Sequence, residues 1–158
     1  MIRVLFAVSE AVPFAKSGGL GEVAGSLPQA LSHAGADVRV VLPKYWDIPD
    51  EFKRQMTHLG SVAVPLGWRK QYCGISRLEH KGITFYFLDN EYYFKRSGYY
   101  GYFDEAERFA FFCRGVLHSL GVMNFMPDIL HCHDWQSSLI PVFLRAFYED
   151  VPTLRNIK

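Results

Sequence analysis

The sequence has little excess of charge of either sign, since it contains 17 lysine and arginine residues and 16 aspartate and glutamate residues. A net charge of +1 creates no broad field that would attract nucleic acid or acidic lipid. Long apolar runs are also missing, because the opening run Ile2–Val8 is too short for a membrane span or a signal-peptide core. We therefore expect neither nucleic acid nor a membrane as a partner.

Cysteine is scarce. Cys73, Cys113 and Cys132 form an odd set without the paired spacing of a metal site. Such a set is typical of buried free thiols in a reducing compartment. We expect a soluble, cytoplasmic protein without a bound metal.

The residues that are present suit one globular core. Apolar residues make up 49% of the 158 positions and charged residues 21%, which excludes a disordered chain. Strands are predicted where apolar runs are bounded by turn residues, and helices where apolar residues recur at helical spacing. The predicted strands are 2–8, 37–42, 83–88 and 128–132, and the predicted helices are 21–33, 104–120 and 137–147.

This alternation of strands and helices predicts an α/β fold with an open, mostly parallel, doubly wound (Rossmann-like) sheet. Residues 46–80 contain β-like runs at 61–64 and 71–78 and are predicted to form an irregular β insertion. Pro28 lies inside the first helical pattern and predicts a kink, and Gly35 predicts its end.

The stretch Lys16–Ala24 is the most informative part of the chain. Lys16 and the glycines Gly18, Gly19 and Gly21 lead from a loop into the first helix. Glycines let a ligand approach the backbone closely, and the first amides of a helix favour an anion. Lys16 adds a full positive charge. The pattern therefore predicts a site for the diphosphate of an activated small molecule.

Other interpretations of these glycines remain open. Gly19, Gly21 and Ala24 have the spacing of a dinucleotide fingerprint, but a long loop separates Val8 from Gly19 and no acidic residue ends the second strand. Lys16 precedes the glycines, unlike the lysine of a Walker loop. A purely structural turn is the third alternative.

A polar cluster, His131–Gln136, ends the last predicted strand. His131 and His133 are expected to share a face of that strand. Asp134 suits the N-cap of the following helix, and Asp104 with Glu107 resembles a capping box before the helix at 104–120. The functional interpretation is a polar site at the mouth of the sheet. Two histidines and one carboxylate are few ligands for a metal.

The segment Tyr92–Phe103 is rich in aromatic residues and glycine. Its aromatic and basic residues could stack nucleic-acid bases, but the chain has no extended basic surface. Packing of the loop over the sheet and stacking against the apolar faces of a sugar chain are the alternatives.

Taken together, these motifs resemble the bacterial glycogen synthase and plant starch synthase family. Its hallmark, Lys-x-Gly-Gly-Leu, stands at Lys16–Leu20. The similarity extends over the whole chain in the family's order, at residues 4–28, 40–45, 88–90, 107–112 and 131–136.

The resemblance implies the first part of the N-terminal domain of a two-domain GT-B glycosyltransferase. The second, nucleotide-binding domain lies outside residues 1–158. The complete enzyme would transfer glucose, with retention, from ADP-glucose to the non-reducing end of an α-1,4-glucan. No further cofactor is implied, and the chain alone is expected to be inactive.

The resemblance also implies roles for particular residues. Lys16 would contact the donor phosphate, and Gly18 and Gly19 would give it access to the backbone. Asp134 and His133 would be catalytic. Substrate contacts are implied for Trp135, for Glu22, where the family usually has aspartate, and for Tyr92 and Tyr93 near the acceptor path.

Two further classes of function stay open beside the synthase. One is a Rossmann-type NAD(P)-dependent oxidoreductase domain. The other is a non-catalytic glucan-binding module, which would hold glucan without needing Lys16.

Overall fold

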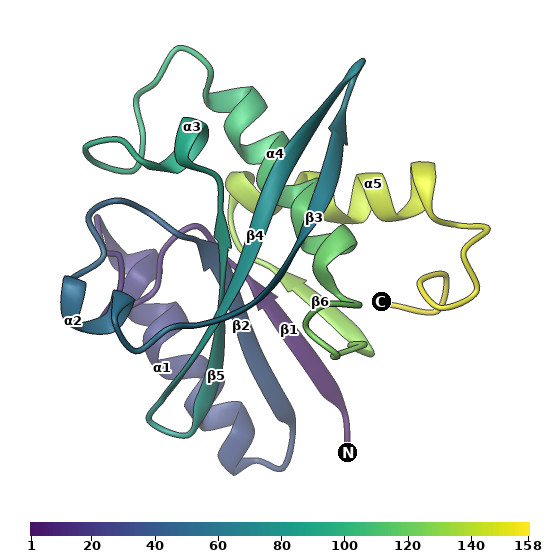
Figure 1. The fold of residues 1–158 in the computed structure, drawn as a ribbon. Helices are drawn as coiled ribbons and strands as arrows, with labels where there is room; N and C mark the ends of the chain where they lie inside the picture. The colour runs from purple at the N-terminus through teal and green to yellow at the C-terminus, as the bar shows by residue number, and fades with distance from the viewer.

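The computed structural model describes all 158 residues. They form one sheet with helices on both faces (Figure 1). The strands lie in the order β3-β4-β5-β2-β1-β6. Their bounds are β1 Arg3–Ala7, β2 Asp37–Pro43, β3 Thr57–Leu66, β4 Arg69–His80, β5 Ile83–Asp89 and β6 Ile129–Cys132. The helices are α1 Gly19–His33, α2 Asp50–Lys53, α3 Glu91–Phe94, α4 Glu105–Ser119 and α5 Leu139–Phe147, with a 3₁₀ turn η1 at Trp135–Ser137.

The predicted doubly wound α/β fold is confirmed. Strands β5, β2, β1 and β6 are parallel, and β1 pairs with both β2 and β6. Helix α1 packs beside β2, whereas α4 and α5 pack together on the opposite side of the sheet (Figure 1). Central strands are buried on both faces, as Leu5, Phe6 and Ala7 show with no exposed surface.

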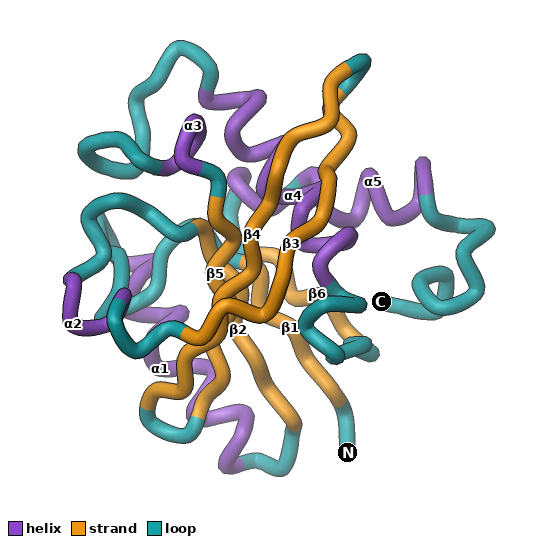
Figure 2. The backbone as a smooth tube through the Cα atoms, in the orientation of Figure 1, coloured by secondary structure: helices purple, strands orange, loops and turns teal.

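The β insertion is more regular than predicted. Its two strands, β3 and β4, form an antiparallel hairpin, and β4 pairs antiparallel with β5. Figure 2 shows this hairpin as part of the same sheet, with its turn reaching past the other strands. Gly67 supplies the turn with a positive φ of 56°. The insertion is therefore an extension of the sheet edge.

Several predicted details of the helices need correction. Pro28 lies inside α1, which is continuous from Gly19 to His33, and the predicted kink there stays a prediction. The short helices α2 and α3 lie where only insertion and loop were expected. The end of α1 is as predicted, because Gly35 has a φ of 97° and donates to Ser32.

The predicted capping box at α4 is wrong. Asp104 makes no capping hydrogen bond; its carboxylate forms a bidentate ion pair with Arg96, at 2.6 and 2.8 Å. Glu107 instead accepts hydrogen bonds from Arg69 and Tyr93. Long-range partners outcompete the local cap because an arginine fork makes two charge-assisted hydrogen bonds at once.

Most of the aromatic segment Tyr92–Phe103 packs against the rest of the protein, which was one of the interpretations that the sequence left open. Its anchor is Arg108 of α4, whose side chain is fully buried. The guanidinium donates to the carbonyl oxygens of Tyr93 and Tyr99, at 2.9 and 3.0 Å, and to Glu105 at 2.6 Å. It also lies 4.8 Å from the centre of the Tyr102 ring. One arginine thus holds the segment against the sheet.

The pair of Arg96 and Asp104 predicts acid sensitivity. Its hydrogen bonds hold the pKa of Asp104 below its usual value of 3.8. A carboxylate whose pKa is lower in the folded state adds stability above its unfolded value, and this is lost as pH falls through the folded value. We expect the urea midpoint to fall below about pH 4, and Asp104→Asn to flatten that dependence. An equally steep profile in Asp104→Asn would contradict this assignment.

No helix of the structure has the length and apolar character needed to cross a membrane.

Candidate functional site

The carboxyl ends of β1 and β6 bring together the two motifs of the sequence. Ala7 at the end of β1 pairs with Cys132 at the end of β6. The loop carrying Lys16 follows β1, and His133–Trp135 follow β6 directly. Both motifs therefore leave the sheet at the same edge, which is the edge where open parallel sheets bind ligands.

The glycine loop presents backbone amides without protein partners. No hydrogen bond of the protein uses the amides of Gly18, Gly19 or Leu20, and Gly18 caps α1 without a side-chain bond. A side chain at Gly18 or Gly19 would meet no atom within 4 Å, whereas one at Gly25 would collide with Val12. Packing therefore explains Gly25 but not the glycine pair, whose free space lies open to a ligand.

The stem of Lys16 lies next to Gly21 in the first turn of α1, and its ammonium forms an ion pair with Glu22. About half of each side chain is exposed, at 50% and 60%. Exposed pairs contribute only about 0–1 kcal/mol. A more highly charged phosphate can therefore displace Glu22 from the Lys16 ammonium at little cost.

Asp134 has an uncommon backbone conformation. Its φ is 63° and its ψ is −179°, a region that only glycine adopts easily. The carboxylate accepts a hydrogen bond from the Trp135 amide at 2.7 Å and so caps the 3₁₀ turn, whereas the N-cap of the predicted helix, α5, is Ser138. A strained residue at the mouth of the sheet often serves a ligand site.

This strain gives a prediction on stability. Because glycine relieves the strain and alanine does not, we expect Asp134→Gly to be more stable than Asp134→Ala by about 1–2 kcal/mol. Urea unfolding of the two variants measures the difference. Equal stabilities would show that the backbone relaxes around Asp134 without cost.

His133 follows β6 directly and is partly buried. Its ring stacks on Phe6 at 4.6 Å and lies 4.3 Å from His131, so the two histidines share a face as predicted. Burial, and then the charge of His131, lower the pKa of His133. Its Nε2 is buried without a protein hydrogen bond. The ring is therefore held by packing, and one nitrogen is left unused by the protein.

Trp135 is half exposed beside these groups and packs edge-on against Phe109 of α4, with ring centres 5.2 Å apart. An exposed indole face near a polar cluster suits the apolar face of a sugar. The structure thus brings together Lys16, Gly18, Gly19 and Glu22 on the β1 side, and His133, Asp134 and Trp135 on the β6 side.

The two tyrosines of the predicted acceptor path lie in α3, which follows the carboxyl end of β5 at the same edge of the sheet. Tyr93 is fully buried, stacks near Phe111 and donates a 2.5 Å hydrogen bond to Glu107. Its side chain is closed to a glucan in this structure, so packing accounts for it. Tyr92 is 61% exposed and lies beside Arg96, and its proposed contact with glucan stays a prediction.

Glu10 and Tyr100 belong to the same edge but were missed from the sequence. Glu10 is buried and accepts a hydrogen bond from the Ser17 amide in the glycine loop. Tyr100 also donates to Glu10, at 3.3 Å. The sequence signal that could have identified Glu10 was its position just after a buried strand, where an unpaired charge is costly.

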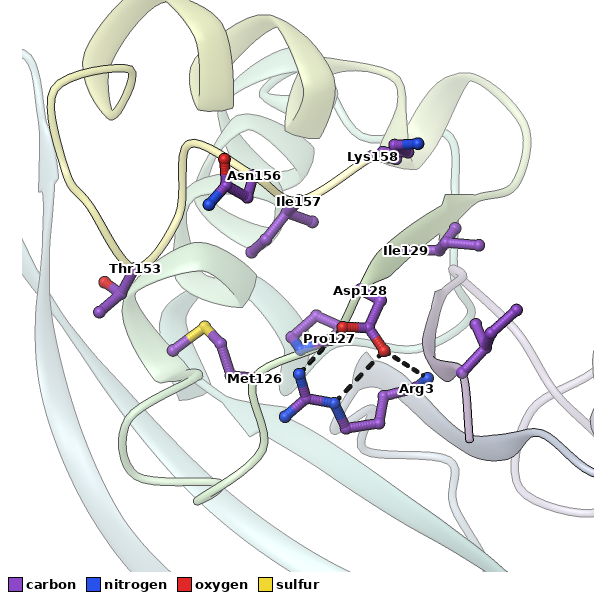
Figure 3. Close-up of a pocket in the computed structure, with 10 residues that line it drawn as sticks. Arg3, Met126, Pro127, Asp128, Ile129, Thr153, Asn156, Ile157 and Lys158 are labelled. Carbon is purple, nitrogen blue, oxygen red and sulfur yellow. Dashed lines mark hydrogen bonds and ion pairs between the residues drawn. The ribbon is translucent and has the colours of Figure 1, made fainter.

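The largest cavity lies at the opposite edge of the sheet. It has a volume of about 470 Å³ and is bordered by the exposed ion pair of Arg3 and Asp128 and by residues 153–158 (Figure 3). Arg3 begins β1 and Asp128 precedes β6, so this cavity is at the amino ends of the strands. It is therefore separate from the candidate site.

No group of three or more histidine, cysteine, aspartate or glutamate side chains is placed to hold a metal ion. The candidate site offers instead an ammonium, open amides, an imidazole and a carboxylate. This set can bind an anion and hydroxyl groups.

Comparison with known proteins gives a consistent result. A family model described as the starch synthase catalytic domain matches residues 3–158. The glycogen synthase of Caldicellulosiruptor saccharolyticus is 55% identical over 157 residues, which are 99% of this chain and 33% of that protein. The glycogen synthase of Anoxybacillus flavithermus is also 55% identical, over 99% of this chain and 34% of that protein.

A solved structure shows the same fold. It is the catalytic domain of starch synthase IV from Arabidopsis thaliana bound to ADP and acarbose. The TM-score is 0.90 at 29% identity, covering 99% of this chain and 32% of that one. The chain thus spans about a third of the length of the relatives that it matches.

Proposed function

Because the chain belongs to the starch synthase catalytic domain family, we propose that it forms the phosphate-binding and acceptor-side part of a glucan synthase. It would be the first part of an N-terminal GT-B domain, and a second domain would hold the nucleotide base. The complete protein would extend an α-1,4-glucan with glucose from a sugar nucleotide.

One observation carries this proposal. Gly18 and Gly19 have free amides and open space where their side chains would stand, and Lys16, which precedes them in the same loop, carries a half-exposed ammonium paired only with Glu22. Departure of a nucleoside diphosphate builds negative charge, which preorganised amides and an ammonium stabilise. Since those groups supply positive charge, the proposed reaction needs no further cofactor.

The donor is proposed to be ADP-glucose, and transfer to retain the anomeric configuration. The ADP named in the Arabidopsis starch synthase structure supports this choice of nucleotide, and its acarbose supports a glucan-like acceptor. On the acceptor side, Asp134 and His133 would hold the sugar hydroxyls, and Trp135 would stack on the ring. The site geometry favours this function over an oxidoreductase, because no acidic residue ends β2, whose last residue is Pro43.

We propose that the chain alone is inactive, because it spans about a third of its relatives. We also propose a cytoplasmic location. Three free cysteines, two of them buried, suit a reducing compartment.

The test is a chimaera in which this chain replaces the matching third of the synthase of Caldicellulosiruptor saccharolyticus. Incorporation of radioactive glucose from ADP-glucose into glycogen, sensitive to an α-specific amylase, is expected. UDP-glucose and the chain alone serve as comparisons, and the parent synthase is the positive control. A folded chimaera that binds glycogen but never transfers glucose would instead support a glucan-binding module.

A further inference from the structure

Glu10 makes an unusual set of contacts for a buried carboxylate. It is only 3% exposed and has no arginine or lysine partner. Its oxygens accept hydrogen bonds from the Ser17 amide, from the Ser17 hydroxyl at 3.1 Å, and from the Tyr100 hydroxyl at 3.3 Å. Burying a charge without a cation is costly unless its hydrogen bonds are satisfied. The three donors therefore have to stay in place.

The Ser17 contact decides which amides of the loop are free. Glu10 takes the amide of Ser17, and the next amides, those of Gly18, Gly19 and Leu20, have no protein acceptor. The two hydrogen bonds from Ser17 to Glu10 fix the backbone one residue before these amides. Their direction is thus set before a ligand arrives, which reduces the entropy cost of binding.

Tyr100 connects this loop with the other half of the site. Ser9 lies 2.7 Å from the Tyr100 hydroxyl, which donates in turn to Glu10. Burial raises the pKa of Tyr100, so that its hydroxyl stays protonated and able to donate. The Tyr100 ring lies 6.0 Å from that of Phe109, which supports Trp135.

We propose that Glu10 is a positioning residue, which holds the glycine loop open for the phosphates of the donor and ties it through Tyr100 to the sugar side. This inference rests on the proposed function and adds to it. Glu10 touches no reacting atom. It acts through the Ser17 amide and hydroxyl, and its oxygens are occupied by these donors and by the Tyr100 hydroxyl.

The test uses nuclear magnetic resonance on the 158-residue chain with ADP as the probe. Amide exchange at Ser17 reports the contact with Glu10, and the shifts of the Gly18 and Gly19 amides report ADP binding. In Glu10→Ala we expect the Ser17 amide to lose protection and the ADP affinity to fall about tenfold, as loss of a charged hydrogen bond predicts.

Two further variants separate positioning from simple stability. Glu10→Gln keeps one carbonyl acceptor and is expected to retain part of both the protection and the affinity. Glu51→Ala removes an exposed carboxylate on α2 and is expected to change neither. Should Glu10→Ala melt at a lower temperature but bind ADP as the wild type does, Glu10 is merely structural and the inference is overturned.

Failure of the proposed function gives a different result. In that case ADP leaves the Gly18 and Gly19 amides of the wild-type chain unshifted, although Ser17 stays protected by Glu10. The phosphate-site proposal, and the positioning role that depends on it, are then both overturned.

Discussion

Lys16→Ala is expected to lower kcat/KM for ADP-glucose by about 10²–10³-fold in the chimaera, the effect of removing one preorganised donor from a site of developing charge. The Lys16 ammonium belongs to the loop that carries the open amides and is held only by the half-exposed Glu22. It would therefore be free to follow the departing diphosphate. Steady-state kinetics at saturating glycogen measure the loss.

Two controls make this result specific. Lys16→Arg keeps the positive charge but replaces the compact ammonium with a planar guanidinium. We expect it to recover part of the rate. Lys70→Ala removes an exposed lysine of β4, far along the hairpin, and should leave the kinetics unchanged. If Lys16→Ala retained a rate within threefold of the parent, the mechanism proposed for the glycine loop would be wrong.

The second large effect concerns Arg108. Arg108→Met fills a similar volume but leaves the carbonyl oxygens of Tyr93 and Tyr99 and the Glu105 carboxylate without their donor. Removing one partner from a buried charged network typically costs several kcal/mol. We expect a loss of about 3–5 kcal/mol in the free energy of unfolding, measured by urea denaturation of the chain.

Arg114→Met is the matched control on the same helix. Arg114 is partly buried, lies 4.7 Å from the centre of the Phe147 ring and makes one long hydrogen bond to Tyr148, at 3.4 Å. We expect a loss below about 1 kcal/mol. Similar losses for both variants would mean that Arg108 acts only by its volume.

Regular periodicity made the sheet predictable. Buried runs such as 37–42 and 83–88 lie within β2 and β5, and their order along the chain implied the parallel sheet. The hairpin was harder, because β3 is largely exposed and lacks a clear alternating pattern. Its strand β4 is set by pairing with β5, a contact that no local pattern encodes, and β3 pairs in turn with β4.

The candidate site, too, was predictable in part. The places of the glycine loop and of His131–Gln136 in the fold were predictable because each stands between a strand and the helix that follows it. The resemblance implied Tyr92 and Tyr93 together near the acceptor path, yet Tyr93 is buried while Tyr92 is exposed. Glu10 was missed because its partners, Ser17 and Tyr100, come together only in the fold. Burial and partner choice depend on tertiary packing, which composition does not report.

The half-exposed Trp135 has a practical consequence for optical work. Its indole packs on Phe109 beside Asp134, whereas Trp46 and Trp68 lie in other parts of the surface. With Trp46→Phe and Trp68→Phe, all tryptophan emission from the chain would come from Trp135. Under the proposed function, a bound sugar ring would shield it from water and from soluble quenchers. The emission of Trp135 would then report carbohydrate at the mouth of the sheet.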